Sequence, residues 1–304
     1  MKKRALNPLA DPIFKRIFGE EKEILMELIN AVMQLKHPVV EIEYLPPELL
    51  PQNVDKKTTV VDVRCTDDVG RHFIVEMQVA RQKALKKRVF FNAARVYGRQ
   101  IAPGDDYDLL QPVFALCLVD HVIEHDTDRW KHKYIIINED DPGRRIKEME
   151  MHFIELSKCR ERGNFNYENV LDRWVKYLID PEFIKSLKMN AQYNYPNLKK
   201  AVDLLDESNY TEGQLVAYDR YLDSIRTWNS SMKLSYEEGI DEGRALGREE
   251  GRVEGKEEGV KEGAQILALA LKALKAGNSP DEVAEAYGFD LSFIQALYQQ
   301  LMGS

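Results

Sequence analysis

The sequence has no apolar run that approaches the roughly 20 residues needed to span a bilayer, so we expect no membrane partner. Its opening stretch, MKKRALNPLADPIFKRIF, carries basic side chains but lacks the apolar segment and small-residue cleavage site of a signal peptide. We therefore expect a cytoplasmic protein.

Cysteine is scarce as well. Cys65, Cys117 and Cys159 are odd in number and lie in or just after expected strands. They fit buried thiols in a reduced core better than a disulfide framework or a CxxC metal site. The patterns GxxxxGK[ST], GxSxG and HExxH are missing, which argues against a phosphate-binding loop, a serine hydrolase and a zinc protease. His121 and His125 fall across a strand end, where a surface loop is expected rather than a metal site.

The net charge of −8 argues against nucleic acid as a partner, but the charge is unevenly distributed. Residues 1–103 carry 18 Lys/Arg against 13 Asp/Glu, a net of +5, whereas residues 236–263 carry 5 against 10, a net of −5. Residues 81–99 contain seven basic side chains and no acidic one. A local basic surface can bind phosphate although the whole molecule is acidic.

The order of elements predicts a mixed α/β fold up to about residue 160 and a helical remainder. Asp11 and Pro12 are expected as N-cap and first residue of a helix that continues through residues 24–33. Periodicity and turn residues predict further helices and strands. The expected strands are 58–66, 71–79, 113–123, 133–138 and 149–156, and a basic helix is expected over 83–101.

Glycine recurs at every fourth position from Gly239 to Gly263, among Glu, Lys and Arg. Each glycine costs a helix about 1 kcal/mol relative to alanine. However, Leu246, Val253 and Val260 begin a seam with a spacing of seven, which favours a helix that self-associates. A solvated tether is the alternative. We therefore predict four parts: a core over 1–160, a helical extension over 161–235, the glycine-repeat helix over 236–264 and a C-terminal unit over 265–304.

The C-terminal unit has the outline of a helix-turn-helix. Ser279, Pro280 and Glu282 form a capping-box pattern, and Gly288 divides the following residues into two short helices. Many helical hairpins of this kind contact no DNA, so both interpretations stay open.

Three polar side chains stand out in the hairpin VVDVRCTDDVGRHFIVEMQV (residues 60–79). If residues 68–70 form a three-residue loop with Gly70 in the left-handed conformation, Asp62 lies directly opposite Glu76. A five-residue loop would place Asp62 diagonal to Glu76 on the same face. Gln78 follows two residues later on the same face. The odd-numbered residues, among them Val61, Val63 and Val75, are expected to face the core.

Opposed carboxylates repel each other unless a cation lies between them. Asp62 and Glu76, with a backbone carbonyl and substrate phosphate, are suitable oxygen ligands for Mg²⁺. A solvent-facing strand surface would also explain these side chains. A metal site is favoured because Ile74 shares their face and because a purely basic helix follows. In that helix Arg88, Asn92, Arg95 and Arg99 form one stripe suited to a phosphate backbone, to which Lys15 and Arg81 could add.

Asp62, thirteen residues and then Glu-Met-Gln resembles the PD-(D/E)XK nuclease core, with glutamine in place of lysine. Five segments in order, covering nearly the whole chain, resemble the recombination-promoting nuclease (Rpn) family, also called PD-(D/E)XK family transposases. These segments are NPLADPIFKRIFG, VDVRCTDDVGRHFIVEMQV, YDLLQPVFALCLVDH, HFIELSKC and EEGIDEGRALGREEG.

The resemblance implies a restriction-endonuclease-like fold and a bacterial Mg²⁺-dependent DNA endonuclease that promotes recombination. Another divalent ion, such as Mn²⁺ or Ca²⁺, would suit the same ligands. Asp62 and Glu76 would be the metal ligands, Gln78 would occupy the lysine position, and Asp11 would be an accessory acid or simply an N-cap. If a lysine is required, Lys15 or Arg81 could supply the charge. Otherwise the glutamine form is a working variant, or the protein is an inactive DNA-binding or oligomeric scaffold. A homo-oligomer is expected through the C-terminal helical region.

Overall fold

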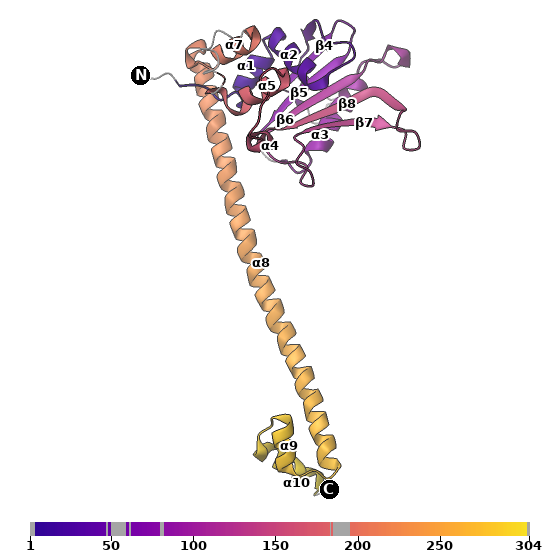
Figure 1. Ribbon diagram of the computed structural model, residues 1–304, viewed down its shortest axis with the longest axis vertical. Helices are drawn as coiled ribbons and strands as arrows, with labels where there is room; N and C mark the ends of the chain where they lie inside the picture. The colour runs from indigo at the N-terminus through magenta and orange to yellow at the C-terminus, as the bar shows by residue number, and fades with distance from the viewer. Residues whose placement is uncertain are drawn as a thin grey trace. The chain divides into compact units, whose positions relative to one another are not determined.

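The computed structural model describes residues 4–46, 48–49, 59–60, 62–79, 82–182, 184 and 195–302. The chain divides into two compact units, residues 1–228 and residues 229–304. A mixed α/β architecture is confirmed for the first unit, since a six-stranded sheet is covered by helices on both faces (Figure 1).

The sheet has the order β1-β4-β5-β6-β8-β7. Its three central strands β5, β6 and β8 are parallel, whereas β1, β4 and β7 join antiparallel at the edges. A separate pair is formed by β2 and β3. The bounds are β1 Ile42–Tyr44, β2 Glu48–Leu49, β3 Thr59–Val60, β4 Val63–Asp67, β5 His72–Gln78, β6 Val113–Val119, β7 Lys131–Ile137 and β8 Arg145–Glu155.

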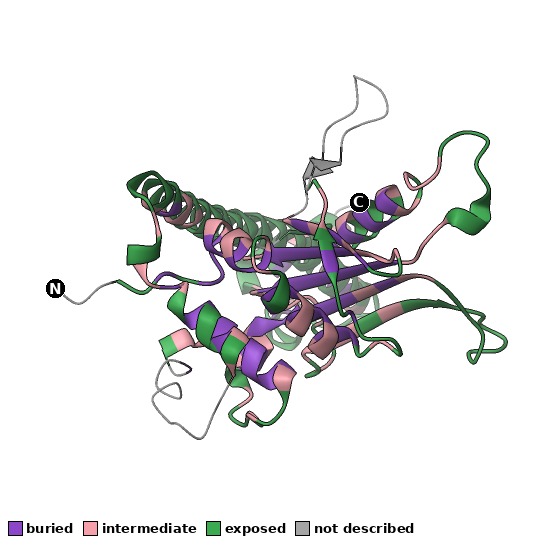
Figure 2. Ribbon diagram, turned by 90° about the horizontal axis from the view of Figure 1, so that it is seen from above, coloured by how far each residue is buried: buried purple, intermediate pink, exposed green. Residues whose placement is uncertain are grey.

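One face of the sheet packs against α1, α2, α4, α5 and α7, and the other face packs against α3. Every residue of β6 is buried, as expected for a parallel strand covered on both sides, and Figure 2 shows the buried central strands. The bounds in this unit are α1 Asp11–Phe18, α2 Lys22–Met33, α3 Leu85–Tyr97, η1 Tyr107–Leu109, α4 Leu156–Glu161, α5 Val170–Ile179, α7 Pro196–Asp203 and η2 Glu207–Asn209.

The hairpin of β4 and β5 has the first of the two registers that the sequence left open. Val63 pairs with Val75 and Cys65 with Phe73, which confirms the three-residue loop. Gly70 has φ +82°, a conformation that L side chains rarely adopt. Val63 and Val75 are buried in the core as expected, and Val61 lies outside the described residues. The opposite face is also a core, because Ile74 packs under α3.

The start of the first helix differs from the prediction. Ala10 is the N-cap of α1 and makes no side-chain cap, so Asp11 is the first helical residue and Pro12 follows it. The carboxylate of Asp11 instead accepts a hydrogen bond from Lys15. The helix ends at Gly19, and α2 is a separate element rather than a continuation.

The second unit contains most of α8 (Glu212–Lys275), with α9 (Pro280–Tyr287) and α10 (Leu291–Met302). The capping box of Ser279 and Glu282 is present, and Gly288 adopts φ +71° at the end of α9. A small core joins α8 to both short helices through Leu274, Val283 and Ile294. Within the described part of the chain, no helix combines the length and the apolar character needed to cross a membrane.

Candidate active site

Asp62 lies immediately before β4, and its carboxylate is fixed by the neighbouring strand. The backbone N–H of Met77 donates to Asp62 Oδ2 at 2.6 Å. This bond places Asp62 beside the end of β5, as the hairpin register requires, because Val63 and Val75 are already paired. The side chain of Asp62 is only 16% exposed.

The surroundings of Asp62 disfavour its ionised form. Burial raises the pKa of Asp62 to about 6, against the hydrogen bond from Met77, which lowers it. The negative charges of Asp11 and Glu76 raise this pKa as well, while Lys15 lowers it. Burial is the largest of these causes, and among the neighbouring charges two acids act against one cation.

Glu76 is a buried carboxylate held by α3. Asn92 Nδ2 donates to Glu76 Oε1 at 2.9 Å, and Arg88 Nη2 donates to Oε2 at 3.2 Å. Glu76 and Asn92 are 3% and 1% exposed, so this contact lies inside the protein. Half of the predicted basic stripe, Arg88 and Asn92, is therefore turned inward to Glu76. The prediction that Asn92 lies beside DNA is wrong, because Asn92 is buried against Glu76. Its spacing of four from Arg88 indicates that the two side chains share a helix face, but it does not indicate that this face is buried.

Gln78 lies on β5 beside this pair but does not contact either carboxylate through a described hydrogen bond. Its side-chain Nε2 donates to the carbonyl of Met77 at 2.8 Å. The backbone carbonyl of Gln78 accepts from the backbone N–H of Asp120 at 2.9 Å. The amide of Gln78 is therefore directed at the main chain.

Lys15 reaches the site from α1. Its Nζ lies 2.9 Å from Asp11 Oδ1 and 3.8 Å from Asp62 Oδ1. Tyr221, near the start of α8, lies close to the same acids: burial raises its pKa, and the charges of Asp11 and Asp62 raise it further. No sequence signal pointed to Tyr221, because its position depends on how α8 packs on the first unit.

The remaining basic residues lie on the α3 face of the sheet. Arg95 stacks over the ring of Phe91 with 5.5 Å from its guanidinium carbon to the ring centroid, and Arg99 follows one turn later. Burial and the charge of Arg99 lower the pKa of Arg64, a half-buried residue of β4. In the described part of the chain, Arg64 Nε has no hydrogen-bond partner. Arg81 lies outside the described residues.

A divalent ion fits two carboxylates here. The described residues contain no group of three or more His, Cys, Asp or Glu side chains arranged to hold a metal ion. However, Mg²⁺ is often bound by one or two carboxylates while water and phosphate complete its shell. Among the described residues Asp62 Oδ1 forms an ion pair with Lys15, at 3.8 Å, and each oxygen of Glu76 accepts one described hydrogen bond although it has two lone pairs. The donor set and the excess negative charge around Asp62 suit a cation.

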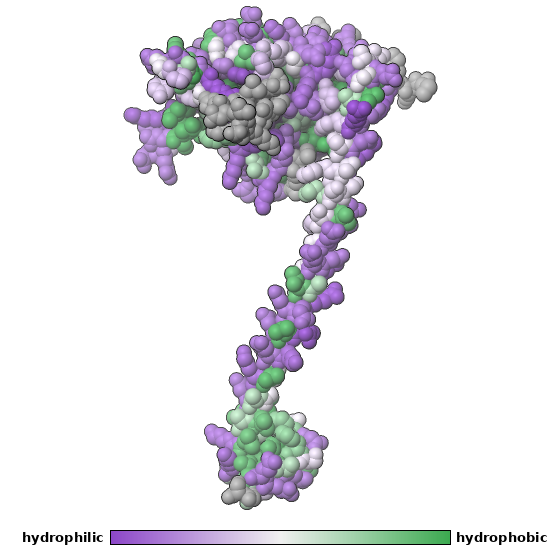
Figure 3. All heavy atoms as spheres, turned by 180° about the vertical axis from the view of Figure 1, so that it is seen from behind, coloured by the Kyte–Doolittle hydropathy of each residue, from purple (hydrophilic) through white to green (hydrophobic). Residues whose placement is uncertain are grey.

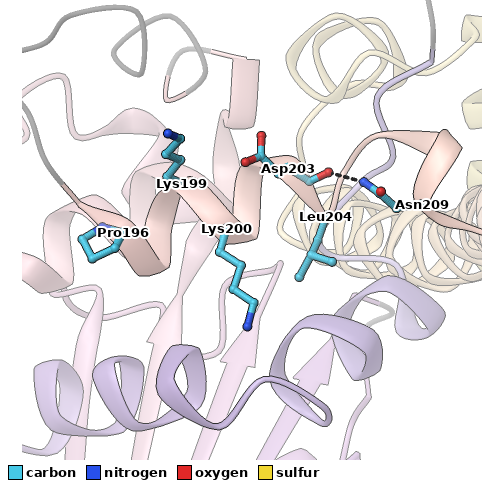
Figure 4. Close-up of a pocket in the computed structure, with 6 residues that line it drawn as sticks. All are labelled: Pro196, Lys199, Lys200, Asp203, Leu204 and Asn209. Atoms are coloured by element: carbon cyan, nitrogen blue, oxygen red, sulfur yellow. Dashed lines mark hydrogen bonds between the residues drawn. The ribbon is translucent and has the colours of Figure 1, made fainter.

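A surface hollow of about 390 Å³ lies elsewhere on the first unit (Figure 4). Asn209 donates to the carbonyl of Asp203 across it, and Lys200 pairs with Glu21. None of its lining residues belongs to the Asp62–Glu76 pair. They are Pro196, Lys199, Lys200, Asp203, Leu204 and Asn209.

Comparison with known families agrees with this geometry. The model of the PD-(D/E)XK nuclease family transposases matches residues 8–235, which is most of the chain. The chain belongs to this family. No curated protein and no solved structure gives a significant match to the sequence. Nucleases of the PD-(D/E)XK type act with divalent metals, and the match includes both Asp62 and Glu76.

The raised pKa of Asp62 predicts a pH-dependent cost to this PD-(D/E)XK protein. Between about pH 4 and pH 6 the folded protein keeps a proton on Asp62 that the unfolded chain has released. The free energy of unfolding therefore falls across this range and reaches its lower level as the pH rises through 6. We expect Asp62→Asn to raise the free energy of unfolding at pH 8 by up to about 3 kcal/mol, with no gain below pH 4. Urea unfolding without divalent ions measures both.

Asp68→Asn in the exposed turn is the matched control, since it removes the same charge outside the site. An Asp62→Asn protein that is no more stable than the wild type at pH 8 would show that the site imposes no such cost.

Proposed function

We propose that this chain is a divalent-metal-dependent DNA endonuclease that hydrolyses phosphodiester bonds and thereby promotes DNA recombination or transposition. The observation that carries this proposal is the pairing of Asp62 and Glu76 at one end of the hairpin, beneath the arginine-bearing helix α3. Membership of a nuclease family of transposases supports the reaction class and DNA as the substrate.

Asp62 and Glu76 would hold the divalent ion, with the Met77 carbonyl as a further oxygen ligand. Bound Mg²⁺, or Mn²⁺ or Ca²⁺ in its place, supplies charge neutralisation at the phosphate and lowers the pKa of an attacking water. The protein's own contribution is orientation. The N–H of Met77 fixes Asp62, while Asn92 and Arg88 fix Glu76, so neither carboxylate must reorganise when substrate arrives.

The basic side chains would hold the DNA backbone along the α3 face. Arg64 and Arg99 lie near each other, and no described carboxylate forms an ion pair with either. Such a cluster of like charges is unfavourable until an anion binds, and DNA phosphate is an anion of the required charge. Arg88 and Arg95 on α3, Lys15 on α1 and Arg81 are the further DNA-contact candidates.

A non-catalytic DNA-binding protein that has kept the fold is the second candidate. Gln78 favours it, since a neutral amide occupies the lysine position and is directed at the Met77 carbonyl. The two functions differ in whether phosphodiester bonds are broken.

Supercoiled plasmid incubated with Mg²⁺ or Mn²⁺ tests the first function. We expect the wild type to nick or linearise it, and Asp62→Asn and Glu76→Gln each to lower the rate at least about 100-fold, because each removes a charged ligand at the reacting phosphate. The same ions should raise the thermal midpoint of the wild type and leave that of Asp62→Asn unchanged.

Chelator-treated protein and the Asp68→Asn variant are the controls. Equal cutting by the wild type and both site variants would remove Asp62 and Glu76 from the reaction. DNA retardation without any cutting under these metals would establish the second function instead.

Arg64→Gln and Arg99→Gln test the DNA path. We expect each to weaken binding of a short duplex and to lower the salt slope of the binding constant by about one, because one phosphate contact is lost. Without DNA, neither variant should unfold more easily, because the repulsion between the two arginines is relieved. Arg144→Gln, at a residue paired with Asp141 on the β7–β8 hairpin, is the control. An unchanged slope, or a clear loss of stability, would mark Arg64 as structural.

Self-association through α8 is the proposed oligomeric contact. Leu246, Val253 and Val260 are 65%, 44% and 66% exposed. Figure 3 shows separate apolar patches along an otherwise hydrophilic helix. A Cβ added at any glycine from Gly239 to Gly263 would meet no described atom within 4 Å. The described part of one chain therefore does not require these glycines, whereas a second helix lying close to the backbone would.

Replacing Leu246, Val253 and Val260 together by Gln should lower the molar mass in light scattering, since the apolar seam between copies is lost. Replacing Glu249 and Glu257 by Gln is the control, as both are exposed positions of the same helix segment. Identical mass for the wild type and the triple variant would leave α8 as a solvated tether.

A further inference from the structure

The site lacks the positive charge that a lysine at position 78 would provide. Gln78 is neutral, and its side-chain Nε2 donates a hydrogen bond to the Met77 carbonyl at 2.8 Å. Arg88 is the cation nearest to Glu76, at 3.2 Å, but it is bound to that carboxylate. Hydrolysis of a phosphodiester builds up negative charge on the phosphate oxygens, so a cation close to Asp62 would be useful.

Lys15 is in the required place. Its Nζ lies 3.8 Å from Asp62 Oδ1, on the oxygen that does not accept the Met77 hydrogen bond. The side chain is 41% exposed, so a DNA phosphate can reach it. In contrast to Arg88, Lys15 approaches Asp62 rather than Glu76, and the two cations therefore flank the carboxylate pair from different helices.

The position of Lys15 is fixed by α1. Ile13, Phe14 and Ile17 are fully buried, so this short helix cannot turn about its axis without exposing them. Asp11, one turn earlier, holds Nζ at 2.9 Å and limits the rotamers of the long side chain. A flexible ammonium is thereby oriented before substrate binds.

We propose that Lys15 is a catalytic residue that supplies, from α1, the charge missing at Gln78. The proposal rests on the nuclease function above. During hydrolysis one P–O bond forms to water, the P–O bond to the leaving sugar oxygen breaks, and one proton of the water ends on that oxygen. Lys15 keeps its protons and donates a hydrogen bond to a non-bridging oxygen of the phosphate. Asp11 acts as a positioning residue for Lys15.

Four full-length proteins test this: wild type, Lys15→Met, Arg16→Met, and Lys15→Met combined with Gln78→Lys. The readouts are the single-turnover cleavage rate at saturating DNA with Mg²⁺, the DNA dissociation constant with a chelator and no divalent ion, and the thermal midpoint. Arg16→Met is the matched control, since Arg16 is the next residue of α1 and pairs with Glu20.

We expect Lys15→Met to cut about 100-fold more slowly than the wild type while its DNA affinity changes by less than about threefold. Arg16→Met should cut at the wild-type rate. The double variant should recover at least about tenfold of the loss, because a lysine at position 78 restores the charge from β5. A purely structural role of Lys15 would not be repaired by a substitution on another element.

Wild-type rates for Lys15→Met would overturn the catalytic role and leave the nuclease function intact. A slow Lys15→Met whose double variant is equally slow, with an unchanged thermal midpoint, would also overturn it. A wild type that binds DNA but does not cut would remove the nuclease function and, with it, this inference.

Discussion

The buried carboxylate of Glu76 is the constraint on which the rest of the site depends. A charge that is 3% exposed must be paired and hydrogen-bonded, because an isolated ion in the interior is very costly. Asn92 and Arg88 provide both requirements from α3. The basic helix is thus joined to β5 at the residue proposed as a metal ligand. Any shift of α3 along the sheet would leave the charge of Glu76 buried and unpaired, so the proposed metal ligand and the proposed DNA-contacting helix have a shared register.

The hairpin register could be predicted because it depends on local features. A three-residue loop ending in Gly70 and the alternation of Val63, Cys65, Phe73 and Val75 determine which residues are opposed. Asp62 and Glu76 then become neighbours whatever packs around them. This part of the site required no knowledge of tertiary structure, which is why spacing alone was sufficient.

Other contacts depend on packing between distant elements, and sequence periodicity does not report them. The stripe of Arg88, Asn92, Arg95 and Arg99 has the spacing of a polar helix face, yet Asn92 is buried because that face meets Glu76 rather than water. Asp11 has the residue type and the following proline of an N-cap, but Ala10 takes that position. Its carboxylate is then available to Lys15, one turn later on the same helix. The placement of α1 beside β4 brings that lysine to 3.8 Å from Asp62, a contact that periodicity does not report.

Two other features of this surface oppose stability in the absence of ligand. Burial and neighbouring acids raise the pKa of Asp62 to about 6, so ionisation of this carboxyl at neutral pH costs the folded protein stability. Arg64 and Arg99 bring like charges together on the α3 face of the same hairpin. The acids around Asp62 are complementary to a divalent cation, and the neighbouring arginines Arg64 and Arg99 are complementary to a polyanion. A solely structural sheet surface would have no reason to keep either arrangement, because exchanging the charges for neutral side chains would relieve both repulsions. The distribution of unfavourable charge is therefore itself an argument for a metal and a nucleic acid as the missing partners of this surface.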